Sequence, residues 1–339
     1  MDPLTQGVIG AALPQATRRT SRHIRIAAGL GFLAGMAADL DTLIRSESDP
    51  LLFLEYHRQF THSLFFIPVG GVLCALVLHW IFGKRAQLSF ARTALFCTLG
   101  YATHALLDTA TTYGTMLFWP FDQTRYAWSI ISIVDPLFTL PVLGLLAWSW
   151  IKRRPGPARA ALVWAAVYLC FGAYQHMSAR DAGYALAQSR GHDSVRLDVK
   201  PSFANLFLWK SVYEADGAFY VDAVRIGIAP RTFAGERVLK LDIGRDFPWL
   251  SADSQQTRDI VRFDTFSDGY AARDPINAER IIDVRYSFVP NRTAALWGIT
   301  VRPDSDADGH AEYVTDRRDA RRRFKELWEM LWAPANKDG

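Results

Sequence analysis

The chain of 339 residues is poor in cysteine and nearly balanced in charge, and both features exclude classes of protein. Its three cysteines, Cys74, Cys97 and Cys170, all lie inside apolar runs. They indicate no disulfide framework, and the lack of cysteine in the polar half is compatible with an oxidising compartment. The formal net charge is only +4, and the arginines are scattered through short loops. The sequence therefore gives no support for nucleic-acid binding.

The first residues lack the pattern of a secretory signal peptide. Their short apolar run, residues 3–13, has no basic residue before it, and the basic cluster follows it. At 1.5 Å per residue this run would cover about 16 Å, which is too little to span a bilayer. We therefore expect a retained, half-inserted helix with Asp2 as its cap and Pro3 in its first turn.

Long apolar runs dominate the first 180 residues. Five of them approach the roughly 20 residues needed to cross a hydrocarbon core about 30 Å thick. They cover residues 24–40, 63–82, 93–107, 130–150 and 160–174. The sequence thus predicts a mainly α-helical polytopic membrane domain over residues 1–180, with about five transmembrane helices.

The pattern changes in the polar half, which follows from about residue 190. Alternation of apolar and polar residues predicts strands over 195–199, 206–213, 219–228, 237–243, 281–289 and 295–301. A helix is expected over 252–266, with Ser251 as its cap. Residues 190–339 are therefore predicted to form a small α+β soluble domain.

A last helix is predicted over residues 315–332, and it is amphipathic. Its apolar stripe comprises Phe324, Leu327, Trp328 and Leu331, and arginines occupy most of the remaining surface. Such a helix can lie on anionic lipid. The alternative, which the pattern favours, is a helix whose apolar stripe docks on its own domain while its basic face stays in water.

Lysine and arginine are unevenly distributed among the short loops. Residues 18–25, 83–92 and 152–159 are strongly basic, whereas the intervening loops 45–60 and 111–128 are not. Because basic loops stay in the cytoplasm, this alternation places the polar half outside. The prediction is a multi-pass protein of the inner membrane, with a periplasmic or extracytoplasmic soluble domain.

Histidine and aspartate residues gather at the outward ends of the predicted spans. The set comprises Asp39, Asp41, His57, His62, His104 and Asp108, with Asp135 as an outlying candidate. Ionisable side chains at membrane depth are costly and are usually functional. The convergence of six of them on one face predicts a metal site rather than packing.

The spacing of these residues suits a shared cation. His104 and Asp108 are four apart and lie on one helical face. His57 and His62 converge if the first lies in a loop and the second in a first helical turn. Asp39 and Asp41 are two apart and cannot share a face of a regular helix, so either the helix ends there or one of them bridges to a neighbour. Histidine and carboxylate ligands without thiolate suit zinc, and also manganese or iron.

Hydrolysis is the simplest reaction that such a centre supports. A divalent metal lowers the pKa of bound water, Asp41 would act as ligand or general base, and Arg58 would orient a lipid or phosphate ester. In the alternative, Arg58 only balances the carboxylates. The polar cluster would then be structural or conduct ions, and the soluble domain would bind a partner. The apolar inner halves of the spans argue against an ion path.

Several short motifs together resemble one known family. They are Met-Asp-Pro-Leu-Thr-Gln-Gly at 1–7, Asp-Leu-Asp at 39–41, His-Arg-Gln-Phe-Thr-His-Ser at 57–63, His-Ala-Leu-Leu-Asp at 104–108, Tyr-Gly-Thr at 113–115 and Trp-Pro-Phe at 119–121. The chain resembles the YdjM-like membrane-bound metal-dependent hydrolases, and its polar domain is similar to that of longer members. The resemblance implies a metal-dependent hydrolase and brings no substrate. It also marks one departure, because the opening motif of the family typically has His where this chain has Gln6. If that His is a ligand, Gln6 would weaken metal binding.

Overall fold

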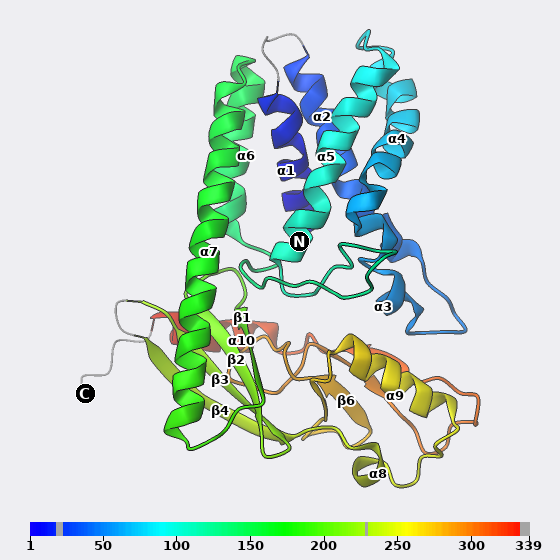
Figure 1. Cartoon of the computed structure of the whole chain (residues 1–339), viewed down its shortest axis with the longest axis vertical. Helices are drawn as coiled ribbons and strands as arrows, with labels where there is room; N and C mark the ends of the chain where they lie inside the picture. Colours follow the sequence, from blue (N-terminus) through cyan, green and yellow to red (C-terminus); the bar gives the residue numbers. More distant parts are fainter. Residues whose placement is uncertain (18–22, 228–229, 333–339) are drawn as a thin grey trace. The chain divides into compact units, whose positions relative to one another are not determined.

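The computed structural model describes residues 1–17, 23–227 and 230–332, and these residues form two compact units. The helical unit comprises Met1–Ile44, Tyr56–Ala173 and Phe203–Asn205. The α+β unit comprises Arg45–Glu55, Tyr174–Ser202 and, within the described part, the residues from Leu206 onward. The predicted fold class, a helical membrane region followed by a small α+β region, is confirmed (Figure 1).

The helical unit begins with a short helix whose cap agrees with the sequence. The Asp2 side chain accepts a hydrogen bond from the Thr5 backbone N–H at 3.0 Å, and Pro3 is the first helical residue. The basic residues Arg18, Arg19 and Arg22 lie outside the described residues. The main helices contributing to this unit are α1 (Pro3–Ala16), α2 (Ile24–Met36), α4 (Ile67–Leu78), α5 (Phe90–Ala110), α6 (Pro136–Lys152) and the first half of α7 (Gly156–Ser189).

Three helical segments of the described chain are long and apolar enough to cross a membrane. They are Ile24–Leu43, Leu64–Gly83 and Gly156–Ser189. The two other predicted spans form helices without meeting both criteria. Helix α5 has 21 residues but contains polar side chains, while α6 has 17 residues. The expected start of the fourth span at residue 130 is wrong, because the Asp135 side chain caps α6 by accepting from the Phe138 N–H.

Helices α1, α2 and α5 pack closely through glycines. A Cβ atom on Gly100 would lie 2.4 Å from the Gly31 carbonyl oxygen, and one on Gly31 would lie 2.4 Å from the Gly10 oxygen. A Cβ on Gly35 would lie 2.9 Å from the Gly10 Cα. Small residues let helix backbones approach in a membrane, where packing replaces the hydrophobic effect as the driving force. This close approach fixes α5, which carries His104 and Asp108, against α2 and α1.

The α+β unit contains two four-stranded antiparallel sheets, each with its strands in sequence order. Sheet one comprises β1 (Arg196–Pro201), β2 (Leu208–Ala215), β3 (Ala218–Arg225) and β4 (Arg231–Leu239). Sheet two comprises β5 (Ala271–Arg273), β6 (Arg280–Asp283), β7 (Trp297–Thr300) and β8 (Glu312–Thr315). The helices of this unit are α3 (Leu52–Tyr56, whose last residue belongs to the helical unit), α8 (Ile243–Asp246), α9 (Gln255–Phe266) and α10 (Ala320–Trp332).

Several predicted boundaries in this unit were wrong for local reasons. Helix α9 is capped by Ser254 rather than Ser251, since the Ser254 side chain accepts from Thr257 N–H. Helix α10 begins at Ala320 rather than 315, because Thr315 pairs with Trp297 in a sheet. The strand expected over 237–243 overlaps only the end of β4, because β4 ends at Leu239 and the short helix α8 begins at Ile243. The strand expected over 219–228 ends at Arg225, and Ile228 lies outside the described residues.

The segment Arg45–Glu55, expected as a loop between two spans, belongs to the core of the α+β unit. Leu51 and Leu54 are buried in one cluster with residues such as Phe263. The Arg262 guanidinium on α9 pairs with Asp49 at 2.9 Å and with Glu55 at 2.7 Å. This segment precedes most of its unit by more than a hundred residues in the sequence, so its packing is a long-range contact that local patterns do not reveal.

Candidate metal centre

Three elements of the helical unit bring the predicted ligands together. Helix α2 continues as the 3₁₀ helix η1 (Ala37–Leu43), whose tighter winding carries Asp39 and Asp41. The end of the regular helix before these residues, one of the two predicted alternatives, is therefore confirmed. His62 closes the 3₁₀ turn η2 (Phe60–His62), and His57 lies just after α3. His104 and Asp108 lie one turn apart on α5.

Four of these side chains surround one point. His62 Nε2 lies 3.2 Å from Asp108 Oδ2 and 3.5 Å from Asp39 Oδ1. His104 Nε2 lies 3.4 Å from each of the same two oxygens. In tetrahedral zinc sites with ligand bonds of 2.0–2.2 Å, neighbouring ligand atoms are about 3.3–3.6 Å apart. These four distances therefore match four of the six edges of such a tetrahedron, and all four ligand atoms lie within 4.8 Å of one another.

The two histidines form hydrogen bonds through Nδ1, which leaves the Nε2 atom of each ring available as a metal ligand. His104 Nδ1 lies 2.5 Å from the Gly35 carbonyl oxygen, which can only accept, so Nδ1 carries the proton. His62 Nδ1 lies 2.9 Å from Thr61 Oγ1 and 3.1 Å from Asp41 Oδ2. His62 Nε2, His104 Nε2 and Asp108 Oδ2 are buried without a hydrogen-bond partner. Outer hydrogen bonds of this kind orient metal-binding histidines and set their tautomer.

Asp41 and His57 lie beside these four residues. Asp41 Oδ1 is 2.8 Å from His57 Nδ1, and Asp41 Oδ2 accepts from the Arg58 N–H at 3.0 Å and the Thr61 hydroxyl at 2.8 Å. Asp39, Asp41 and His57 also offer ligand atoms within 4.8 Å of one another. Asp41 thus contacts both His57 and His62. It contacts His62 at Nδ1, so the Nε2 atom of His62 stays directed at the other three candidate ligands.

Positively charged and amide groups converge on Asp108. Arg58 is buried, its Nε lies 3.2 Å from Asp108 Oδ2, and its Nη1 donates to Thr111 Oγ1 at 3.0 Å. Gln6 Nε2 donates to Asp108 Oδ1 at 2.8 Å, and the Met1 amino group contacts the same oxygen. In this chain the amide nitrogen of Gln6 therefore positions Asp108 through a hydrogen bond.

Burial and carboxylates compete over the protonation of the loop histidines. Burial lowers the pKa of His62, but the nearby carboxylates of Asp108, Asp39 and Asp41 outweigh it and raise the pKa to about 10. Burial lowers the pKa of His57, although Asp41 opposes the shift. His57 is therefore neutral near pH 7. The carboxylates around His62 favour positive charge there, and a divalent cation supplies that charge as well as a proton does.

Not every candidate joins the cluster, and some members were missed. Asp135 caps α6 and accepts from the Tyr168 hydroxyl at 2.9 Å, and it belongs to neither metal-binding group found among the described residues. The sequence did not reveal the contributions of Gly35 and Thr111, because one acts through its backbone carbonyl and the other through a contact across the fold. The contact of the Met1 amino group with Asp108 could have been suspected from the motif at residues 1–7.

Comparisons with known proteins match the chain to inner membrane proteins. The family model described as YdjM inner membrane protein matches residues 1–179. Inner membrane protein YbcI of Escherichia coli (strain K12) is 31% identical over 121 residues, which are 32% of this chain and 65% of that relative. The match thus spans less than two thirds of the relative's length. No solved structure matches the chain.

Proposed function

The chain belongs to the YdjM family of inner membrane proteins, and from this premise we propose that it is a metal-dependent hydrolase acting at the membrane on a lipid or another phosphate ester. The proposed centre binds a divalent ion, with zinc favoured over manganese or iron, through Asp39, His62, His104 and Asp108. Its orientation toward the periplasm is part of the proposal and rests on the distribution of basic loops.

One observation carries the metal assignment. Three buried ligand atoms, on His62, His104 and Asp108, converge without any hydrogen-bond partner. Leaving a buried polar atom unsatisfied costs about 1–3 kcal/mol each, and more for a charged group. A cation at their centre would satisfy all three together with Asp39. Nitrogen and oxygen ligands at tetrahedral spacing favour zinc.

In the proposed enzyme the surrounding residues would have separate tasks. A bound ion would polarise an ester oxygen and acidify water. Asp39, whose side chain is 21% exposed while the other three ligands are buried, marks the open side of the centre. We propose that neutral His57, held at Nδ1 by Asp41, would take up a proton, and that the general-base role predicted for Asp41 would be exercised through this pair. Arg58 steadies Asp108 and offers positive charge to phosphate oxygens.

A structural ion is the alternative, and the geometry gives it a specific argument. Structural zinc sites are closed by four protein ligands, whereas catalytic sites usually keep one position for water. Four protein ligands surround this centre. Under this alternative the ion would join η1, η2 and α5, and the soluble unit would bind a partner.

Metal analysis of the purified full chain tests the centre. The wild type should retain a stoichiometric transition metal, and His62→Ala and His104→Ala should each lose it. The matched control is His79→Ala, because His79 also lies in a membrane helix but contacts Thr93 outside the cluster. Unchanged metal content in both cluster variants would refute the proposed ligand set.

Turnover separates the enzyme from the structural alternative. We expect metal-loaded wild type in lipid vesicles to hydrolyse a phospholipid or a phosphate monoester. His57→Gln should keep the metal and lose most of the rate, since general-base catalysis typically contributes about 10²–10⁴-fold. Metal-loaded wild type without turnover of either substrate class would favour the structural ion.

A further inference from the structure

Helix α10 has one broad apolar side, and only part of it packs on the α+β unit. Leu327 is buried against Leu208 and Ala223 of the first sheet, with Met330 and Leu331 packed around it. Phe324, Trp328 and Trp332 lie elsewhere on the helix and are 46%, 53% and 66% exposed. The docked helix expected from the sequence thus explains only part of its apolar surface.

The exposed aromatic residues form a continuous stripe. Phe324, Trp328 and Trp332 are spaced by four residues, and their rings contact in sequence at centroid distances of 6.1 and 5.6 Å. Residues four apart lie on one side of a helix. Three adjoining exposed aromatic rings are unusual on a solvated surface, since they leave a contiguous apolar patch in water.

Charge on α10 is arranged around this stripe. At 100° per residue, Arg321 and Lys325 project on the same side as the aromatic residues. Arg321 has no ion-pair partner among the residues that the structure describes, and Lys325 has only an exposed pair with Glu329 at 3.7 Å. Exposed pairs of this kind contribute little. The aromatic stripe is therefore flanked by positive charge that is available to an anionic surface.

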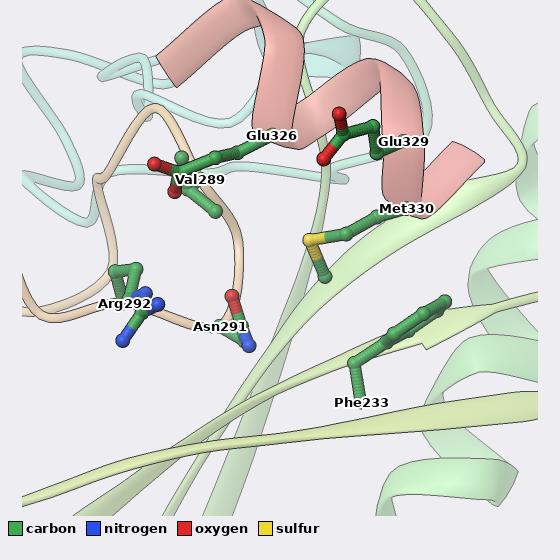
Figure 2. A pocket seen from close by; sticks show the side chains of 7 residues that line it. All are labelled: Phe233, Val289, Asn291, Arg292, Glu326, Glu329 and Met330. Atoms are coloured by element: carbon green, nitrogen blue, oxygen red, sulfur yellow. The ribbon is translucent and has the colours of Figure 1, made fainter. Parts of the chain in front are cut away.

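Glu326 and Glu329 of α10 border a hollow beside its own domain. Glu326, Glu329 and Met330 line a hollow of about 320 Å³ together with Phe233 of β4 and the loop residue Arg292 (Figure 2). In Figure 2 Glu326 extends from α10 toward Val289, and Met330 lies between the helix and the loop. Glu329 is 63% exposed and pairs with Lys325, so among the described residues Arg321 carries the positive charge beside the stripe that no acidic residue balances, and this charge suits an anionic partner.

We propose that this face of α10, defined by Arg321, Phe324, Lys325, Trp328 and Trp332, binds the anionic headgroup region of the bilayer in which the chain is anchored. Tryptophan is enriched at membrane interfaces, and arginine and lysine are attracted by anionic lipids. The bilayer is always near, because α7 contains a candidate span and continues into the α+β unit without a break. This inference depends on the membrane family and is independent of the hydrolase proposal.

Spin labels on the full chain in lipid nanodiscs test the contact. A label on Trp328→Cys should be more accessible to oxygen, which dissolves in lipid, than to a water-soluble nickel reagent. A label on Ile276→Cys, an exposed position of the same unit outside α10, is the comparison site and is expected to show the reverse. The difference should be large with phosphatidylglycerol and several-fold smaller with phosphatidylcholine alone.

Charge variants show whether the basic residues contribute. In the labelled chain, Arg321→Gln with Lys325→Gln should move the Trp328 label toward water. The matched control, Arg318→Gln with Arg322→Gln, removes the same charge from residues that pair with Asp316 and Asp319, and it should leave the label in lipid. Retained circular dichroism shows that each variant is folded. A Trp328 label as water-accessible as the Ile276 label in phosphatidylglycerol would overturn the proposal.

Discussion

At the scale of single residues, the α+β unit buries one amine among neutral acceptors. Lys210 Nζ donates to Ser287 Oγ and the Arg292 carbonyl oxygen, both at 2.8 Å, and to the Pro290 oxygen at 3.3 Å. Among the described residues no carboxylate lies within ion-pair distance of this amine. Burial therefore lowers the pKa of Lys210 from 10.5 to about 7. The native state thus favours the neutral amine more than the unfolded state does.

Stability should consequently depend on pH through Lys210. Between pH 7 and 10.5 the unfolded chain holds a proton that the native chain has lost, so the free energy of unfolding rises with pH across this window. The full difference is on the order of a few kcal/mol. Lys210→Met removes the titration, so its advantage in thermal midpoint over wild type should be larger at pH 7 than at pH 10. An advantage that is equal at both pH values would contradict the assignment.

The candidate metal-binding residues were predictable one by one, but their supporting contacts were not. Asp39, His62, His104 and Asp108 were found because ionisable side chains stand out within apolar runs. The orientation of His104 depends on the Gly35 carbonyl oxygen, and every residue has such a group. Sequence patterns therefore identify the side chains that supply chemistry, while the backbone atoms that orient them appear only in the fold.

At the scale of elements, the close packing of α1, α2 and α5 positions the centre. The same contacts that bring Gly100 against Gly31 place His104 beside Gly35. Helices α2 and α5 were foreseen from their apolar runs, whereas their close approach depends on glycines at matching heights on separate helices. The change from α2 to the 3₁₀ helix η1 was anticipated only through the spacing of Asp39 and Asp41.

A single methyl group at this crossing should disturb the centre. In Gly100→Ala the new Cβ would lie 2.4 Å from the Gly31 oxygen, so α5 must shift away from α2. Overpacking of this kind typically costs about 1–3 kcal/mol. We expect a lower thermal midpoint and weaker metal retention. The control is Gly144→Ala on α6, where a Cβ meets nothing within 4 Å, and it should match wild type. Equal metal retention in both variants would mean that the crossing does not position His104.

At the scale of the whole molecule, the packing of Arg45–Glu55 relates the two halves of the chain topologically. This segment joins the candidate spans Ile24–Leu43 and Leu64–Gly83, yet Leu51 and Leu54 lie in the core of the α+β unit. A segment cannot share a core with residues across a bilayer. We infer that the loop and the polar half lie on the same side of the membrane. The distribution of basic loops separately predicted that residues 45–60 and the polar half both lie outside.

Labelling of single cysteines in cells tests, with one reagent, whether the loop and the polar half lie on the same side and whether that side is outside. Glu47→Cys and Ile276→Cys introduce exposed thiols in the loop and in the polar half, and Arg85→Cys introduces one in a basic loop. With the outer membrane permeabilised, a membrane-impermeant maleimide should label the first two before lysis and the third only after it. Wild type, whose cysteines lie in apolar helices, gives the background. Labelling of Arg85→Cys alone before lysis would invert the topology and keep the shared side. If only one of Glu47→Cys and Ile276→Cys is labelled before lysis, the loop and the polar half do not lie on the same side of the membrane. The common core requires both positions to lie in one compartment, whichever way the spans run.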